Sequence, residues 1–159
     1  MKDSFDFSGF FCDVMLGDLA KWLRILGLKV NYDNKADDNL IVYTAKRENL
    51  LIITKDRELA RRKGVDAILI ETDGIEDMIK EVLLKTGIKL SDLKPFKYCP
   101  VCGSKLEKRD RDDVRWFVPQ KVYEEFSEFF VCNNCVKVYW KGTHFKKIEA
   151  FVENLRSRL

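Results

Sequence analysis

The sequence predicts an α/β fold, in which a mainly parallel sheet is flanked by helices and followed by a small metal-binding module. Two observations lead to this prediction. Short apolar runs alternate with segments of helical periodicity in residues 1–90, an order typical of parallel sheets. Residues 91–159 instead carry two Cys-x-x-Cys pairs. We therefore expect two domains, 1–90 and 91–159, divided where the rhythm of the sequence changes.

The elements of the first domain follow from apolar runs and from signals that end helices. A near-continuous apolar run such as 50–54 is typical of a strand that is buried on both faces. Helices are expected where apolar residues recur at helical spacing, and Gly27, Gly64 and Gly87 mark their ends. In chain order we expect strand 10–14, helix 16–26, strand 29–32, helix 38–49, strand 50–54, helix 56–63, strand 67–70 and helix 75–85.

The second domain is expected to combine short strands with two helices. A highly charged stretch, 105–115, follows the first cysteine pair. Pro119 suits the start of a helix, because its fixed φ matches the first helical turn. After the charged stretch we expect strand 116–118, helix 119–126, strand 136–140 and an amphipathic helix 143–156.

Four of the five cysteines form two Cys-x-x-Cys pairs separated by 29 residues. Each two-residue spacer allows a tight turn that directs both sulfurs at one ion, and two such turns complete a tetrahedron. We expect a structural Zn²⁺, because four thiolates leave no open coordination position. Disulfides or a redox pair are the alternatives, and the fifth cysteine, Cys12, is expected to be a small buried hydrophobe. The expected zinc ligands are Cys99, Cys102, Cys132 and Cys135.

Composition excludes several classes of function. Hydrophobic residues make up 46% of the 159 residues, which is enough for a core, yet no apolar run has the roughly 18 residues that a membrane span needs. The acidic and aromatic N-terminus does not resemble a signal peptide, so we expect a cytoplasmic protein. No Walker loop or Gly-x-Gly-x-x-Gly run is present, and His144 is the single histidine.

Charge is distributed unevenly along a chain whose net charge is +3. Residues 1–90 hold 15 Lys and Arg against 16 Asp and Glu, whereas residues 137–159 hold six basic residues against two acidic ones. An acidic part beside a basic tail suits a metal site next to a phosphate-binding surface. An ordinary mixed surface explains the same distribution, so charge alone does not decide between these interpretations.

Carboxylates follow several of the expected strands. Asp13 lies at the end of the first strand, and Asp56 and Asp73 lie just past two later ones. Asp38 opens a helix and can face the same edge of the sheet, where the carboxyl ends of parallel strands meet and ligands bind. Converging carboxylates repel one another unless a divalent cation lies among them, and hard oxygen ligands suit Mg²⁺ or Mn²⁺. Apart from Asp13, each of these residues can also be explained as a helix N-cap.

Six segments together resemble a known family. The first domain has FCDVMLGDLAKWLR at 11–24, DDNL at 37–40 and ITKDREL at 53–59. The second has the two cysteine pairs, CPVC and CNNC, the latter followed by YWKGTH at 139–144. Over residues 10–150 the chain closely resembles the PIN-like ribonuclease domain and zinc ribbon of the mut-seven C-terminal family.

This resemblance implies a PIN-like fold with ribonuclease activity that depends on Mg²⁺ or Mn²⁺. The family pattern has an acidic residue after the first strand, another at the start of a middle helix, a third in a Thr-x-Asp turn and often a fourth. The implied Mg²⁺ or Mn²⁺ ligands are Asp13, Asp38 and Asp56, and the wider set of implied catalytic residues adds Asp73, Asp37 as a substitute for Asp38, and Thr54 as a support.

Basic and aromatic side chains are candidates for RNA contacts, since Lys and Arg bind phosphates and aromatic rings stack on unpaired bases. We expect single-stranded RNA as the substrate. A non-catalytic module that binds RNA, the ribosome or another protein would share the fold and remains the alternative. The zinc ribbon argues against a toxin of a toxin–antitoxin pair. The candidate RNA-binding residues are Arg24, Lys55, Arg57, Lys141, Trp140 and His144.

Overall fold

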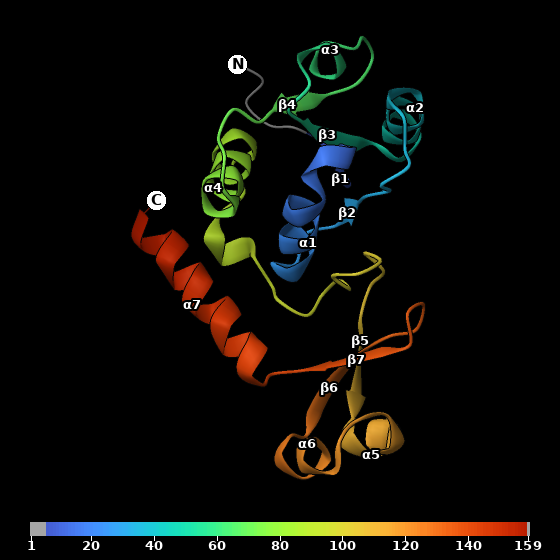
Figure 1. The fold of residues 1–159 in the computed structure, drawn as a ribbon, viewed down its shortest axis with the longest axis vertical. Helices are drawn as coiled ribbons and strands as arrows, with labels where there is room; N and C mark the ends of the chain where they lie inside the picture. The colour runs from blue at the N-terminus through green and yellow to red at the C-terminus, as the bar shows by residue number, and fades with distance from the viewer. Residues whose placement is uncertain (1–5, 159) are drawn as a thin grey trace.

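Residues 6–158, which the computed structural model describes, are organised around two sheets (Figure 1). One has four parallel strands in the order β2-β1-β3-β4, and the other has three antiparallel strands in the order β5-β6-β7. The predicted α/β class is confirmed. The first five residues, on which the expectation about a signal peptide partly rests, lie outside the described residues. The parallel strands are β1 (Gly9–Cys12), β2 (Val30–Asn31), β3 (Leu50–Thr54) and β4 (Ala67–Leu69).

The parallel sheet is covered by helices on both faces. Phe10 and Ile53 belong to a buried cluster with residues of α1 and α4, whereas Phe11 and Ile52 belong to a second cluster with residues of α2. Successive side chains of a strand point to opposite faces, so strands buried on both sides are apolar at nearly every position. The helices of this part are η1 (Val14–Leu16), α1 (Gly17–Ile25), α2 (Asp38–Glu48), α3 (Arg57–Ala60) and α4 (Ile75–Thr86).

The antiparallel sheet differs from the sequence prediction. The predicted strand 116–118 is wrong, because Arg115–Phe117 forms the short 3-10 helix η3, in which Trp116 is 85% exposed. The charged stretch provides strand β5 instead. As an edge strand, β5 pairs on one side through its backbone and can expose charged side chains on both faces. The remaining elements here are η2 (Leu90–Asp92), β5 (Glu107–Asp110), α5 (Arg111–Val114), α6 (Gln120–Glu125), β6 (Glu128–Cys132) and β7 (Lys137–Trp140).

The last helix, α7 (Thr143–Arg158), runs from the antiparallel sheet back toward α4 (Figure 1). Phe151 stacks on Trp22 of α1 with ring centroids 4.4 Å apart. Leu155 is fully buried in the core cluster between the parallel sheet and helices α1 and α4. The helix that we assigned to the second domain therefore packs on the first, and the domain boundary at residue 91 stays a prediction. Between residues 6 and 158 no helix is long and apolar enough to cross a membrane.

Candidate metal-binding sites

Asp13 is a buried carboxylate at the C-terminal end of β1. It is 2% exposed, and its Oδ2 accepts a hydrogen bond of 2.6 Å from the hydroxyl of Thr54. Its Oδ1 accepts a hydrogen bond of 2.8 Å from the backbone N–H of Val14, because Asp13 caps the 3-10 helix that turns the chain from β1 into α1. Burial of a charged group without partners is costly, and these donors hold the carboxylate in place.

Thr54 connects Asp13 to Asp56. It is the last residue of β3, which lies next to β1 and parallel to it. Its hydroxyl donates to Asp13 and also accepts a hydrogen bond of 2.9 Å from the backbone N–H of Asp56. Asp56 in turn caps α3, accepting from the backbone N–H of Glu58 at 2.8 Å. One hydroxyl thus fixes the placement of two acidic residues relative to each other.

Asp38 shares the negative environment of these two residues. Burial raises the pKa of Asp38, and the charges of Asp13 and Asp56 raise it further, while Arg62 opposes them. Effects of this kind arise when like charges lie near one another. The first residue of α2 is therefore electrostatically coupled to the ends of β1 and β3. We refer to Asp13, Asp38 and Asp56 as the acidic cluster.

The two other acidic residues expected at this site have different contacts. Asp37 is the N-cap of α2, and its Oδ1 accepts a hydrogen bond of 2.8 Å from the backbone N–H of Leu40. The side chain of Asp73 is 96% exposed and forms an ion pair of 2.5 Å with Lys55. Gly74 rather than Asp73 is the N-cap of α4. The described contacts therefore do not bring Asp73 together with the acidic cluster.

The acidic cluster is less tightly gathered than the cysteines. Among residues 6–158, only the four cysteines place three or more possible ligand atoms within 4.8 Å of one another. Carboxylates that carry like charges repel at short range, and a cation between them offsets that repulsion. The type of donor nevertheless fits a hard divalent cation, since carboxylate oxygens are the ligands that Mg²⁺ and Mn²⁺ prefer.

Glu81 is a second buried carboxylate, and sequence reasoning missed it. It accepts hydrogen bonds from the hydroxyl of Thr72 at 2.6 Å, from the backbone N–H of Glu71 at 2.9 Å and from Lys85 at 2.7 Å. Burial alone would raise the pKa of Glu81, but these donors lower it to about 2. The only signal in the sequence is a glutamate between the apolar positions Ile79 and Val82 of α4. Glu81 therefore anchors the loop that leads to α4.

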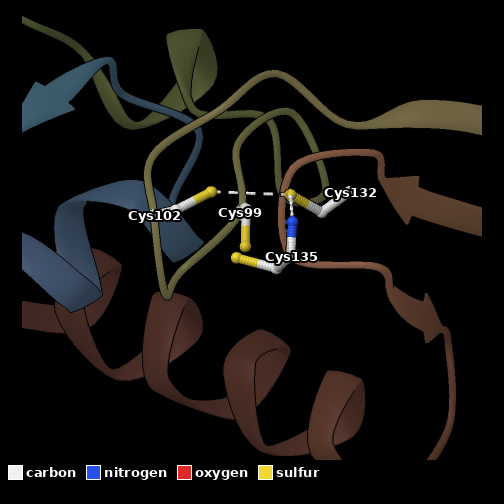
Figure 2. A group of neighbouring side chains, drawn as sticks. All are labelled: Cys99, Cys102, Cys132 and Cys135. Atoms are coloured by element: carbon white, nitrogen blue, oxygen red, sulfur yellow. Dashed lines mark hydrogen bonds between the residues drawn. The ribbon is translucent and has the colours of Figure 1, made fainter.

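The four cysteine side chains converge from two tight turns (Figure 2). Their Sγ atoms all lie within 4.8 Å of one another, and those of Cys102 and Cys132 are 3.5 Å apart. All four are free thiols rather than disulfides. The backbone N–H of Cys135 donates to Cys132 Sγ at 3.3 Å, and Tyr139 Oη lies 3.3 Å from Cys99 Sγ. This arrangement can bind a structural zinc ion through four sulfur ligands.

Hydrogen bonds favour the deprotonated form at one of these ligands. Burial alone would raise the pKa of Cys102, but hydrogen bonds from Ser104 and Asn134 lower it to about 5. A thiol must lose its proton to bind zinc. In the same cluster burial raises the pKa of Cys132, and the hydrogen bond with Cys102 raises that of Cys135, so the argument for a metal site rests on the geometry of the four sulfurs. Cys12 is the opposite case, because it is fully buried and burial raises its pKa far above the usual range. The expectation that Cys12 is a small buried hydrophobe is confirmed.

Arg24 was expected to contact RNA, and the structure corrects this. It is 4% exposed, its Nε donates to the carbonyl of Val30 at 2.9 Å, and its Nη1 donates to the carbonyls of Pro100 and Val101 at 3.3 and 3.2 Å. Gly103, with φ +78°, lies so close that an added Cβ would be 2.9 Å from Arg24 Nε. Arg24 thus joins α1 to the first cysteine turn and is not available to a phosphate.

The remaining candidates for RNA contacts lie at or near the surface. Arg57 and His144 are exposed, at the starts of α3 and α7. Lys141 is exposed and lies 3.8 Å from Glu128, while Trp140 is partly buried at the end of β7. Their binding of RNA stays a prediction.

The fold and the two clusters define the class of protein: an α/β protein with acidic residues at the ends of parallel strands and a four-cysteine cluster that can hold a metal ion. Comparison with models of protein families is more specific. The model of the Mut7-C RNAse domain matches residues 8–152, and the chain therefore belongs to this family. No curated protein and no solved structure matches the chain significantly.

Proposed function

We propose that this chain is a ribonuclease that requires Mg²⁺ or Mn²⁺ and cleaves phosphodiester bonds of single-stranded RNA at the acidic cluster. The observation that carries the proposal is the environment of Asp13. This carboxylate is 2% exposed, lies at the end of a parallel strand, is held by Thr54 and affects the pKa of a neighbouring aspartate. Membership of a family described as an RNAse domain supports the same conclusion.

The residues of the acidic cluster would hold the cation. Once bound, a divalent cation activates water and stabilises the oxygen that leaves during phosphodiester cleavage. Thr54 orients Asp13 by donating to Oδ2, and the same hydroxyl fixes the turn that carries Asp56. Lys55 and Arg57 flank Asp56 in the sequence and can bind the phosphates of the substrate.

The four-cysteine module has a different role in this proposal. Four sulfur ligands leave zinc no open coordination position, so the bound ion stabilises the fold rather than taking part in chemistry. Because Arg24 ties the first cysteine turn to α1, the module is held against the parallel-sheet part. In this proposal the module assists by binding RNA or a partner protein.

One observation favours the second candidate, a non-catalytic module that binds RNA, the ribosome or another protein. The oxygen atoms of the acidic cluster are not gathered within the 4.8 Å that unites the four sulfurs. A module of this kind would bind RNA without cutting it, and adding Mg²⁺ or Mn²⁺ would not change the length of the RNA.

Cleavage of labelled single-stranded RNA with Mn²⁺ or Mg²⁺ tests the proposal. Wild type should cut, and both Asp13→Asn and removal of the divalent cation with EDTA should abolish cutting. The matched control is Asp77→Asn, which makes the same change at an exposed position of α4 and should cut like wild type. Zinc content and melting temperature should be measured for each variant. Equal cutting by Asp13→Asn and wild type would refute the proposal, whereas binding without cutting would establish the second candidate.

A further inference from the structure

A pocket of about 530 Å³ lies where α1, the antiparallel sheet and the start of α7 meet. It is separate from the acidic cluster, since none of its lining residues belongs to that cluster. Its volume falls within the range of roughly 300 to 1,000 Å³ that is typical of sites for small ligands. We call it the aromatic pocket, because its walls include Trp22, Phe96, Tyr98, Tyr139, Trp140 and Phe145.

The rings of this pocket are held by neighbours behind them and remain partly exposed. Trp22 is stacked on Phe151, and Phe96 is stacked on Phe130 with ring centroids 4.6 Å apart. Trp140 contacts Phe129 edge-on with ring centroids 6.3 Å apart, and it lies so close to Gly142 that an added Cβ there would come within 2.8 Å of the indole nitrogen. Rings whose orientation is already fixed lose little entropy when a flat ligand binds, so the pocket is prepared for stacking.

The charged residues of the aromatic pocket are all basic. Lys21, Lys137 and Lys147 line it and are exposed, and His144 lies at the start of α7, while no aspartate or glutamate is among the lining residues. A ligand that fits must therefore combine a flat ring with negative charge. An unpaired base with its phosphate has both properties, since bases stack on aromatic side chains and phosphates bind lysine.

We propose that the aromatic pocket binds an unpaired nucleobase of a single-stranded RNA, with the adjoining phosphates held by Lys21, Lys137 and Lys147. This inference extends the proposed ribonuclease function by adding a second binding site for the RNA. It rests on that function in one respect, because it takes the bound strand to be the substrate. Because the pocket combines α1 with the antiparallel sheet and α7, it forms only when the two parts of the chain are docked.

The three tryptophans of the chain provide a direct test by NMR. Trp22 and Trp140 line the pocket, whereas Trp116 lies outside it and is 85% exposed. Hexauridylate and hexaadenylate RNA are added to the ¹⁵N-labelled protein in buffer without Mg²⁺ or Mn²⁺. The indole N–H signals of Trp22 and Trp140 should shift while that of Trp116 stays in place, with signals assigned from single Trp→Phe variants.

Three outcomes would overturn this proposal. No shift at either pocket signal with millimolar RNA would show that the pocket does not bind RNA. A shift confined to Trp116 would show that RNA contacts η3 instead of the pocket. If the signals of Trp22 and Trp140 shift when an acidic peptide rich in tyrosine is added, but do not shift when RNA is added, the occupant of the pocket is a protein.

Charge reversal supplies a second, quantitative test. The double variant Lys21→Glu with Lys147→Glu should weaken binding of the hexamers by about tenfold or more, and the dependence of affinity on salt should become less steep. Lys121→Glu is the control, because this exposed lysine of α6 does not line the pocket. An unchanged affinity in the double variant would contradict the proposal.

The two proposals can fail separately. The NMR shifts are recorded without the catalytic cation, so they do not depend on cleavage. If the pocket signals shift but wild type does not cut RNA, the pocket is established and the ribonuclease function is refuted. If wild type cuts RNA and the pocket signals do not move, the ribonuclease function stands and the pocket is refuted.

Discussion

The cysteine cluster and the acidic cluster are assembled in different ways. Two residues separate the members of each cysteine pair, so one tight turn places two sulfurs, and the fold needs only to bring two turns together. The acidic cluster consists of Asp13, Asp38 and Asp56, which come from three separate segments. Their like charges repel one another. Local spacing is therefore enough to specify a site that can hold zinc. The acidic cluster depends on the topology of the sheet and, in the proposed function, on a cation that offsets repulsion.

Removing a zinc ligand should have the largest effect on stability. Cys132→Ala deletes one of four sulfurs at a fully buried position, and zinc binding in small modules contributes on the order of 10 kcal/mol to folding. We expect bound zinc to be lost and the melting temperature to fall by roughly 10 °C or more. Elemental analysis and calorimetry measure both. Cys12→Ala is the control and should keep its zinc, and a Cys132→Ala protein that retained zinc would contradict the assignment.

Arg24 joins the two regions, and its replacement should have the next largest effect. Arg24→Met leaves the carbonyls of Val30, Pro100 and Val101 without their donor, which should cost about 3 kcal/mol of unfolding free energy. Denaturation by urea measures this change. The exposed Arg57→Met should leave stability within about 0.5 kcal/mol of wild type. Unchanged stability of Arg24→Met with weaker RNA binding would restore the original sequence interpretation.

Glu81 should make the stability of the parallel-sheet part depend on pH. Its pKa is lowered from an ordinary value of 4.5 to about 2 in the folded protein, so its contribution is complete above pH 4.5 and is lost as the pH falls toward 2. The loss amounts to about 3 kcal/mol. Unfolding free energies of wild type and Glu81→Gln should converge over this range. Parallel curves for the two proteins would show that the carboxylate of Glu81 is not stabilised by folding.

Thr54 should have the smallest effect on stability and a clear effect on the acidic cluster. Thr54→Val removes the hydroxyl that donates to Asp13 and should lower the unfolding free energy by about 1 to 2 kcal/mol. It should also weaken Mn²⁺ binding, because Asp13 loses the group that orients it. Thr54→Ser keeps the hydroxyl and should restore both properties. If Thr54→Val binds Mn²⁺ with the affinity of wild type, Thr54 does not support the metal site.

Local signals predicted much of the fold. The apolar run Leu50–Thr54 forms β3 at the expected bounds. The helix expected at 38–49 is α2, and the residue before it, Asp37, is its N-cap. The strand 116–118 was predicted wrongly, because pairing with β6 rather than apolar sequence decides where the third antiparallel strand lies. Patterns within one segment report on propensity and burial, but an edge strand is specified by its partner.

For the candidate sites, as for the fold, local patterns predicted one part and missed another. Spacing predicted that the four cysteines lie together, and the structure confirms it. Position after a strand suggested Asp13 and Asp56, whose role as metal ligands stays a prediction. Arg24 was assigned to RNA, and Glu81 was missed, because their partners lie 77 and 10 residues away at the farthest and no local pattern distinguishes a buried, satisfied charge from an exposed one. Such residues are recognised only when the fold shows which backbone groups surround them.

The most direct test of the account is Mn²⁺ binding to the zinc-loaded protein, measured by electron paramagnetic resonance. Wild type and Asp77→Asn should bind Mn²⁺ with equal affinity, and Asp13→Asn should bind it roughly tenfold more weakly or worse. Zinc should stay at the wild-type level in all three, because the cysteine cluster is independent of Asp13. If Asp13→Asn binds Mn²⁺ as tightly as wild type, the acidic cluster is not a metal site and the proposed ribonuclease mechanism is wrong.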